Sequence, residues 1–296
     1  MSKNEKDYSW IKRRNVFEEY VEAEYYNKIL KDYIFDKKTD IELFSEWLDT
    51  INVKNSKILE LGCGTGRVTE ALLKKWSEYD ELCLLDLSNQ MLEYSKKKFS
   101  NKKKITFIQN DSLNYMLHSR KKFDIVYSLW SLSHSIHQNL DRLGLLEGEK
   151  YVITVLEKFF RNNIKKNGRF YLIHFDSLSD EQRILIKQWK REFKILEKSE
   201  EQSPSLQVID KALTKLKEEN IIKYKKKRLV GEKIIYSNID EALEAFMNFH
   251  LESYFNDKPY TNDIIKDLKE YFKKFTNEKG EVLIKPGCLI YEVYKN

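Results

Sequence analysis

Residues 57–66 read Lys-Ile-Leu-Glu-Leu-Gly-Cys-Gly-Thr-Gly, and this stretch decides the fold. A short apolar run carries the acidic Glu60 near its end, and three glycines follow at every second position. Apolar Val68, Ala71 and Leu72 then recur at the spacing of a helix. The pattern therefore predicts a strand, a tight glycine turn and a helix in direct succession.

The glycine turn also predicts a ligand site. Glycine accepts positive φ and lets the backbone approach a ligand closely. A helix that begins directly behind the turn offers unpaired N–H groups and the positive end of its dipole. In doubly wound α/β sheets, a nucleotide-like cofactor binds at such a turn.

The spacing of the glycines narrows the kind of cofactor. A dinucleotide site has G-x-G-x-x-G, and a P-loop has G-x-x-x-x-G-K-[ST]. This chain has G-x-G-x-G with Glu60 two residues before the first glycine, and Arg67 directly after the last. A carboxylate beside the turn repels a pyrophosphate but suits a ligand with an ammonium and a sulfonium group. The segment resembles the first motif of the class I S-adenosylmethionine-dependent methyltransferases.

Four further apolar runs follow in the order that this family has, at 81–86, 105–111, 123–129 and 169–175. We expect Asn167-Gly168 to stop a helix before the last of them. The resemblance covers roughly residues 50–176. It implies S-adenosylmethionine as the cofactor and methyl transfer as the activity. The implied cofactor contacts are Glu60, Gly62, Cys63, Gly64, Gly66, Asp86, Leu87, Met91, Asp111, Ser112 and Ser128.

The fold class expected from this resemblance is α/β, with a doubly wound, seven-stranded, mostly parallel sheet and an antiparallel last strand at 287–294. Residues 1–48 are rich in aromatic residues and are expected to form an N-terminal helical lid. Residues 49–296 are expected to form a Rossmann-like methyltransferase domain, with helical insertions at about 177–220 and 239–275.

Composition sets the broad class of protein. The chain has 296 residues, 41% of them hydrophobic, and no apolar stretch approaches the roughly 18 residues of a membrane span. The first residues lack the apolar region of a signal peptide. Three scattered cysteines indicate neither a disulfide framework nor a metal cluster. We therefore predict a cytoplasmic protein with no membrane partner and no metal site.

The net charge of +6 raises the question of nucleic acid binding. The basic runs at 96–98, 102–104 and 225–228 are spread along the chain and interleaved with acids. This dispersion favours solvated faces over a groove that follows phosphates, so we do not expect a nucleic acid partner. Lysines gathered around the cofactor mouth would instead favour an RNA or protein acceptor.

Histidines supply the candidates for a general base, which helps when the acceptor is a hydroxyl or a protonated amine. His134 and His137 fall in a predicted loop after the fourth strand, at the ligand-binding edge, and are the predicted catalytic residues. His174 ends the fifth strand, and His250 lies among aromatic residues on the predicted inserted helix.

The acceptor is predicted to be an N or O atom of a small molecule or peptide. The fourth strand ends in Ser-Leu-Trp-Ser, without the Asn/Asp-Pro-Pro-Tyr of amide and adenine N-methylating members. An RNA or protein methyltransferase, and a cofactor-binding regulatory protein without turnover, stay open as alternatives. The methylated atom and the oligomeric state also stay open. The predicted acceptor-binding residues are Tyr20, Tyr25, Trp130, His134, His250 and Tyr254.

Overall fold

The computed structural model describes residues 29–52, 54–76, 78–192, 202–251 and 254–296. The chain divides into two compact units. One contains Lys31–Glu232 and Lys285–Asn296, and the other contains Lys233–Ile284.

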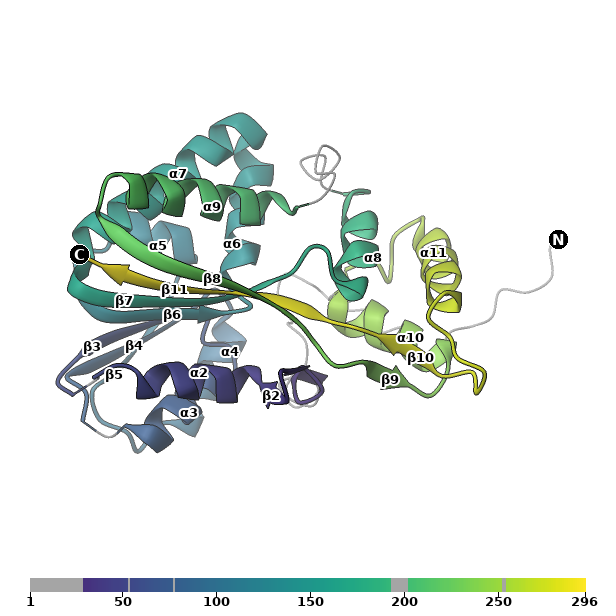
Figure 1. Cartoon of the computed structure of the whole chain (residues 1–296), viewed down its shortest axis with the longest axis horizontal. Coiled ribbons are helices and arrows are strands. Elements are labelled where there is room, and N and C mark those ends of the chain that lie inside the picture. Colours follow the sequence, from purple (N-terminus) through teal and green to yellow (C-terminus); the bar gives the residue numbers. More distant parts are fainter. Residues whose placement is uncertain (1–28, 53, 77, 193–201, 252–253) are drawn as a thin grey trace. The chain divides into compact units, whose positions relative to one another are not determined.

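The first unit is built on a seven-stranded sheet with the order β5-β4-β3-β6-β7-β11-β8 (Figure 1). Strands β3 to β7 are parallel, whereas β11 is antiparallel to both β7 and β8. This confirms the predicted fold class, including the antiparallel last strand. The strands are β3 (Lys57–Leu61), β4 (Glu81–Asp86), β5 (Ile105–Gln109), β6 (Phe123–Leu129), β7 (Ile164–Phe175), β8 (Ile222–Val230) and β11 (Gly287–Lys295).

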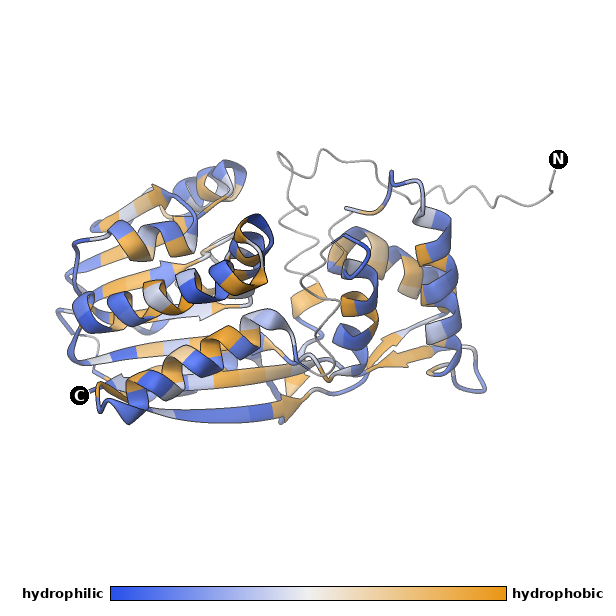
Figure 2. Ribbon diagram, turned by 90° about the horizontal axis from the view of Figure 1, so that it is seen from above, coloured by the Kyte–Doolittle hydropathy of each residue, from blue (hydrophilic) through white to orange (hydrophobic). Residues whose placement is uncertain are grey.

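Helices cover both faces of this sheet, with α7 and α9 on one side and α2 and α3 on the other (Figure 1). Figure 2 shows hydrophobic residues along the strands and in stripes on the helices, the pattern of amphipathic elements that pack on a sheet. The helices are α2 (Asp40–Asp49), α3 (Arg67–Lys75), α4 (Asn89–Lys98), α5 (Ser112–His118), α6 (Leu132–Leu143), α7 (Leu145–Asn162), α8 (Asp180–Trp189) and α9 (Pro204–Glu218).

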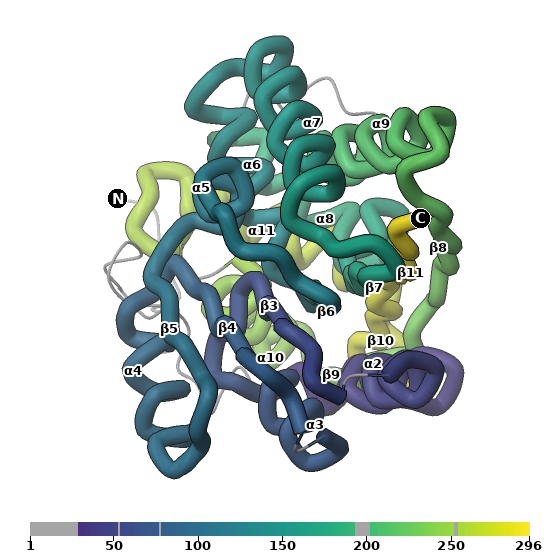
Figure 3. Tube along the Cα trace, turned by 90° about the vertical axis from the view of Figure 1, so that its left-hand side faces the viewer, coloured from purple at the N-terminus to yellow at the C-terminus, as the bar shows by residue number. Residues whose placement is uncertain are grey.

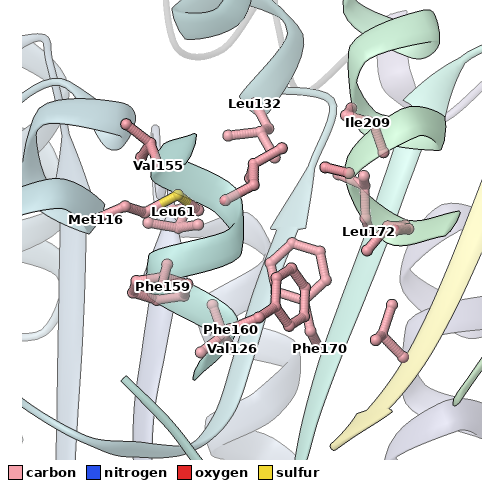
Figure 4. Packing of buried hydrophobic residues seen from close by; sticks show 14 of the residues in the cluster. Leu61, Met116, Val126, Leu132, Val155, Phe159, Phe160, Phe170, Leu172 and Ile209 are labelled. Carbon is pink, nitrogen blue, oxygen red and sulfur yellow. The ribbon is translucent and has the colours of Figure 1, made fainter. Parts of the chain in front are cut away.

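A hydrophobic core lies between the sheet and the helices α5, α6, α7 and α9. Val152, Val155, Leu156 and Phe159 recur at i, i+3, i+4 and i+7 on α7 and are fully buried or nearly so. Figure 4 shows Phe159 and the neighbouring phenylalanine of α7 packed against residues of β6 and β7. Burying each large apolar side chain contributes about 1.5–3 kcal/mol, so this layer anchors the parallel strands.

Helix α2 packs on the opposite face of the sheet. The Phe44 ring lies 4.7 Å from the Tyr127 ring, and the Trp47 ring lies 4.7 Å from the Tyr171 ring. The described residues 31–48 of the predicted lid thus belong to the unit that contains the sheet. The lid itself stays a prediction for residues 1–28, which lie outside the described residues.

Three local predictions were wrong. Residues 34–39, expected to be helical, form the hairpin of β1 (Ile34–Phe35) and β2 (Lys38–Thr39), since Asp36 and Lys37 adopt positive φ at its two-residue turn. The helix before β7 ends at Asn162, and Asn167-Gly168 lie within β7 as an irregularity with Asn167 at a φ of 64°. The predicted loop after β6 is helix α6.

The second unit contains the predicted insertion before the last strand. Strands β9 (Ile234–Tyr236) and β10 (Val282–Ile284) pair antiparallel. The helical part comprises α10 (Ile239–Ala245), a π-helical turn η2 (Phe246–His250) and α11 (Thr261–Lys273). Asn238 caps α10, because its side chain accepts a hydrogen bond from the Glu241 N–H at 2.9 Å. Across the described residues of both units, no helix has the length and apolarity that a membrane crossing requires.

Candidate active site

One of the three glycines in the turn between β3 and α3 faces open space. All three glycines have positive φ, at 74°, 50° and 72° for Gly62, Gly64 and Gly66. A Cβ on Gly62 would lie 1.8 Å from Ser131 Oγ, and one on Gly66 would lie 2.4 Å from the Phe99 ring. A Cβ on Gly64 would meet no described heavy atom within 4 Å. The first and third glycines therefore permit close packing, whereas the second faces open space that a ligand can enter.

Asp86, at the end of β4, holds this turn in place. Its carboxylate accepts hydrogen bonds from the Gly64 N–H at 2.7 Å and the Ser88 N–H at 2.9 Å. Burial raises the pKa of Asp86, while the backbone hydrogen bonds oppose that rise. Carboxylate oxygens accept more than one hydrogen bond, so Asp86 retains capacity for a ligand hydroxyl. The adjacent Leu87 side chain is 54% exposed, which offers an apolar contact beside that carboxylate.

Glu60 lies inside the sheet beneath the turn. One carboxylate oxygen accepts hydrogen bonds from the Thr69 hydroxyl and, at 2.8 Å, from the Tyr127 hydroxyl. Burial raises the pKa of Glu60 to about 8, although both hydroxyl groups favour the ionised form. The side chain is only 2% exposed, so in this structure it ties β3 to α3 and β6.

Several other predicted cofactor residues lie behind the site surface. The Ser128 hydroxyl donates to the Leu61 carbonyl at 2.9 Å. Burial also raises the pKa of the Cys63 thiol well above its ordinary value, which keeps it protonated. Among the described residues, no group of three or more His, Cys, Asp or Glu side chains is arranged to hold a metal ion. The buried members of the predicted cofactor set are Glu60, Cys63, Gly66, Met91, Ser112 and Ser128.

Asp111 connects two helices at the same edge of the sheet. One carboxylate oxygen caps α5 by accepting from the Asn114 N–H at 2.9 Å, and the other accepts from the Ser135 hydroxyl at 2.5 Å. Since Ser135 belongs to α6, Asp111 fixes the start of that helix beside the end of β5.

The two predicted catalytic histidines stand one turn apart on α6. His134 is exposed, its ring lies 6.5 Å from the Phe175 ring, and its charge favours the ionised form of Asp86. His134 therefore lies between the glycine-turn side of the site and the end of β7. Burial lowers the pKa of His137 to about 3, and the charges of His174 and His134 act in the same direction. His137 is thus neutral at physiological pH.

The side chain of His174 is buried, and polar contacts hold both of its ring nitrogens. Its Nε2 atom lies 3.0 Å from Ser205 Oγ, and its Nδ1 atom lies 2.8 Å from the Phe175 carbonyl oxygen. Burial lowers the pKa of His174 to about 4.

Trp130, a predicted acceptor residue, belongs to a buried network that the sequence did not reveal. Its indole N–H donates to the Asp40 carboxylate at 2.7 Å, and both terminal nitrogens of Arg67 donate to the same carboxylate at 2.8 and 2.6 Å. Asp40 is fully buried. The network ties α2 to the first residue of α3 and to the end of β6. The pattern Thr39-x-x-Glu42 signals the start of α2, but no local pattern signals these partners.

An aromatic wall surrounds the Trp130 ring. Phe175 lies 4.9 Å away, Tyr33 lies 5.9 Å away and Phe35 lies 6.1 Å away, measured between ring centroids. The Tyr33 hydroxyl donates to Glu181, whose pKa is raised by burial to about 7. Tyr33 and Glu181 are further residues at this edge that sequence reasoning missed.

The remaining predicted acceptor residues lie elsewhere in the chain. His250 belongs to the second unit, where its ring lies 4.5 Å from Phe246 and burial lowers its pKa to about 3. Tyr254, also in that unit, has the Lys258 ammonium 4.4 Å from its ring centroid. Tyr20 and Tyr25 lie outside the described residues.

Residues 58–144 match a family model described as a methyltransferase domain. This segment is a methyltransferase domain. It is of the class I, Rossmann-like type, in agreement with the resemblance inferred from the sequence. The match spans β3 to α6 and so includes the glycine turn, Asp86, Asp111 and His134.

Curated relatives match about a quarter of this chain. Malonyl-[acyl-carrier protein] O-methyltransferase 1 of Ilyobacter polytropus is 37% identical over 75 residues, which cover 25% of this chain and 27% of the relative. Ribosomal RNA small subunit methyltransferase A of Coxiella burnetii is 34% identical over 68 residues, covering 23% and 25%. The chain thus spans about a quarter of the length of these relatives. Their names point to different acceptors, so the shared segment leaves the acceptor of this chain open.

A solved structure extends the likeness to most of the fold. The YcgJ protein of Bacillus subtilis has a TM-score of 0.52 and 15% identity, with 86% of this chain and 97% of that chain covered. At this identity the likeness establishes the fold alone.

Proposed function

We propose that this chain is an enzyme that transfers a methyl group from S-adenosylmethionine to an N or O atom of a small molecule or peptide. One observation carries the proposal. Within a methyltransferase domain, the open side of Gly64 lies next to the anchored carboxylate of Asp86, and the exposed Leu87 follows directly.

Each of these groups suits one part of the cofactor. Asp86 accepts hydrogen bonds from the ribose hydroxyls, as a carboxylate at the end of the second strand does in such folds. Leu87 provides an apolar surface for the purine ring. The backbone of the glycine turn approaches the methionine part, and Asp111 holds α5 and α6 around the adenine side. Glu60 acts from beneath the turn, together with Thr69 and Tyr127.

S-adenosylmethionine supplies an activated methyl group on its sulfonium. The protein then mainly holds the acceptor in line with the bond that breaks and excludes water. Effective molarity can supply about 7–11 kcal/mol of the barrier in this way. An acceptor hydroxyl or ammonium must also lose a proton, and His134 is the exposed base at this edge that can take it.

The acceptor pocket is proposed to include the aromatic wall around Trp130. Phe175 and Tyr33 contribute to this wall from the end of β7 and from the segment before β1. The sequence-based predictions for Tyr20, Tyr25, His250 and Tyr254 stay predictions, and alanine substitution with methyl transfer as the readout tests each of them.

Calorimetric titration with S-adenosylhomocysteine, with NAD as the control ligand, tests the cofactor. We expect S-adenosylhomocysteine to bind and NAD not to bind, and the reverse would overturn the proposal. Radiolabelled S-adenosylmethionine incubated with panels of amines, hydroxyl compounds and peptides tests turnover. If the cofactor binds but every panel and total RNA stay unlabelled, a regulatory cofactor-binding protein replaces the enzyme.

A further inference from the structure

Basic residues that are scattered along the sequence meet at one edge of the sheet. Strands β3 to β7 are parallel, so their first residues share the edge opposite the glycine turn. Strand β8 also starts there, because Ile222 pairs with Lys295 at the end of β11. Figure 3 looks onto this edge. We call the exposed lysines of this edge that form no ion pair with a described residue the amino-edge lysines: Lys102, Lys103, Lys104, Lys122, Lys166 and Lys223.

These lysines have no acidic partner among the described residues, although other cations at the same edge do. Lys57 pairs with Asp80 at 3.8 Å, Lys165 pairs with Asp124 at 2.8 Å, and Lys121 pairs with Glu81. The acids near the strand starts are therefore engaged already. The amino-edge lysines carry positive charge that the described part of the chain leaves uncompensated.

The cations at this edge also lie close enough to repel one another. Burial lowers the pKa of Lys295, and the charges of Lys122 and Arg161 lower it further. The Lys295 ammonium group donates to the carbonyl oxygens of Arg161 at 2.5 Å and Ile164 at 2.6 Å, which holds it in place at the strand ends. Like charges held together favour an external anion that relieves their repulsion.

A hollow of about 400 Å³ opens at the same edge, lined by Lys102, Lys103, Lys104, Trp76 and Tyr79 among others. The indole N–H of Trp76 is buried and has no hydrogen-bond partner among the described residues. The carboxylate of Glu78 also lines the hollow but is paired with Lys54 at 2.9 Å. The three lysines therefore make the hollow suitable for a side chain that ends in a carboxylate.

We propose that the amino edge is a docking surface for an acidic protein partner, separate from the site of methyl transfer. Strand β6 has seven residues, so at roughly 3.3 Å per residue the two edges lie about 20 Å apart. A partner on the amino edge therefore leaves the glycine turn open. The inference goes beyond the proposed function and does not depend on it.

An acidic protein fits this surface better than a nucleic acid. Lysines outnumber the exposed arginines near this edge, Arg120 and Arg161, whereas arginine has the planar, bidentate geometry that phosphate recognition favours. The interleaved carboxylates of Asp80, Glu81 and Asp124 would repel the rigid, continuous phosphate backbone of a duplex, whereas the side chains of an acidic polypeptide can reach the lysines separately.

The test uses poly-L-glutamate as the probe for an acidic polypeptide and duplex RNA as the comparison, each titrated against the full chain at low salt. The edge variant is Lys102→Glu, Lys122→Glu and Lys166→Glu combined. The matched control is Lys31→Glu, Lys37→Glu and Lys285→Glu, which changes the net charge equally with exposed lysines that are not among the amino-edge lysines. A neutral version of the edge variant, with glutamine at the same three positions, serves if charge reversal impairs folding.

We expect poly-L-glutamate to bind the unmodified chain more tightly than RNA does. The edge variant should lose at least about tenfold in affinity, while the control should lose less than about threefold. S-adenosylhomocysteine affinity should be unchanged in both, which separates this outcome from a failure of the proposed function. Equal losses in the two variants, no binding of poly-L-glutamate, or tighter binding of RNA would each overturn the proposal.

Discussion

The two edges of the central sheet differ in how their charged groups are held. At the carboxyl edge, Asp86 and Asp111 accept hydrogen bonds from neighbouring backbone and side-chain groups. At the amino edge, the lysines stand exposed without acidic partners among the described residues. The first edge is preorganised around a small open space, whereas the second presents a broad field of charge. Ordered polar groups suit recognition of one ligand, and an uncompensated field suits attraction of an oppositely charged surface.

The largest expected effect is the difference between alanine substitutions at two glycines of the carboxyl edge. Gly62→Ala should destabilise the fold by about 3 kcal/mol or more, because its Cβ meets Ser131 and its φ is positive. Gly64→Ala should cost only about 1 kcal/mol of stability yet weaken binding of S-adenosylhomocysteine strongly, since its Cβ enters the open space. Urea unfolding and calorimetry measure the two effects. Equal stability losses would mean that the two positions do not differ as described.

The next effect concerns chemistry at the carboxyl edge. His134→Ala should lower methyl transfer about a hundredfold if the histidine acts as the base. Affinity for S-adenosylhomocysteine should stay within about 1 kcal/mol, because an acceptor-side group acts on the transition state. His137→Ala is the matched control, since His137 is buried and already neutral. If His134→Ala kept full activity, the histidine would not be the base, and the enzyme would act only by holding the acceptor close to the methyl group.

A smaller effect is expected at Asp86. Asp86→Ala should weaken binding of S-adenosylhomocysteine by about 2 kcal/mol, the order of a lost charge-assisted hydrogen bond. Part of this loss reflects release of the Gly64 N–H, which Asp86 also holds. Asp86→Asn, which keeps one acceptor oxygen, should lose less. An alanine variant that binds as tightly as the unmodified chain would remove Asp86 from the site.

The smallest effect concerns stability and pH at Glu60. Its folded pKa of about 8 exceeds the ordinary 4.5, so the folded state keeps a proton that the unfolded state loses between these values. Stability from this group therefore falls as pH rises through that window. The glutamine in Glu60→Gln cannot titrate. Between pH 5 and pH 8, the unmodified chain should therefore lose more free energy of unfolding than this variant does, and the two losses should differ by at least about 1 kcal/mol. Urea unfolding at both pH values measures this, with the exposed Glu147→Gln as control. Parallel pH profiles for Glu60→Gln and the unmodified chain would contradict the assignment.

Sequence patterns predicted the carboxyl edge better than its surroundings. The alternation of strand, turn and helix from Lys57 onward is local, so it identified the sheet and the glycine turn. Helix α6 and the β1–β2 hairpin were missed, because a Ser-rich stretch after β6 and the turn at Asp36 and Lys37 carry weak local signals. The network of Asp40, Arg67 and Trp130 joins residues far apart in the chain, and no spacing rule predicts it.

The sequence alone determined the succession of strands from β3 to β7, the glycine turn and the family resemblance, since these depend on residues a few positions apart. Tertiary structure decided which predicted residues face open space and which support them from within. Glu60 and Ser128 are buried, while Gly64 and Leu87 are open. The tertiary structure also decided where the positive charge gathers. Lysines that are dispersed along the chain stand together at one edge, because parallel strands bring their first residues to the same side of the sheet.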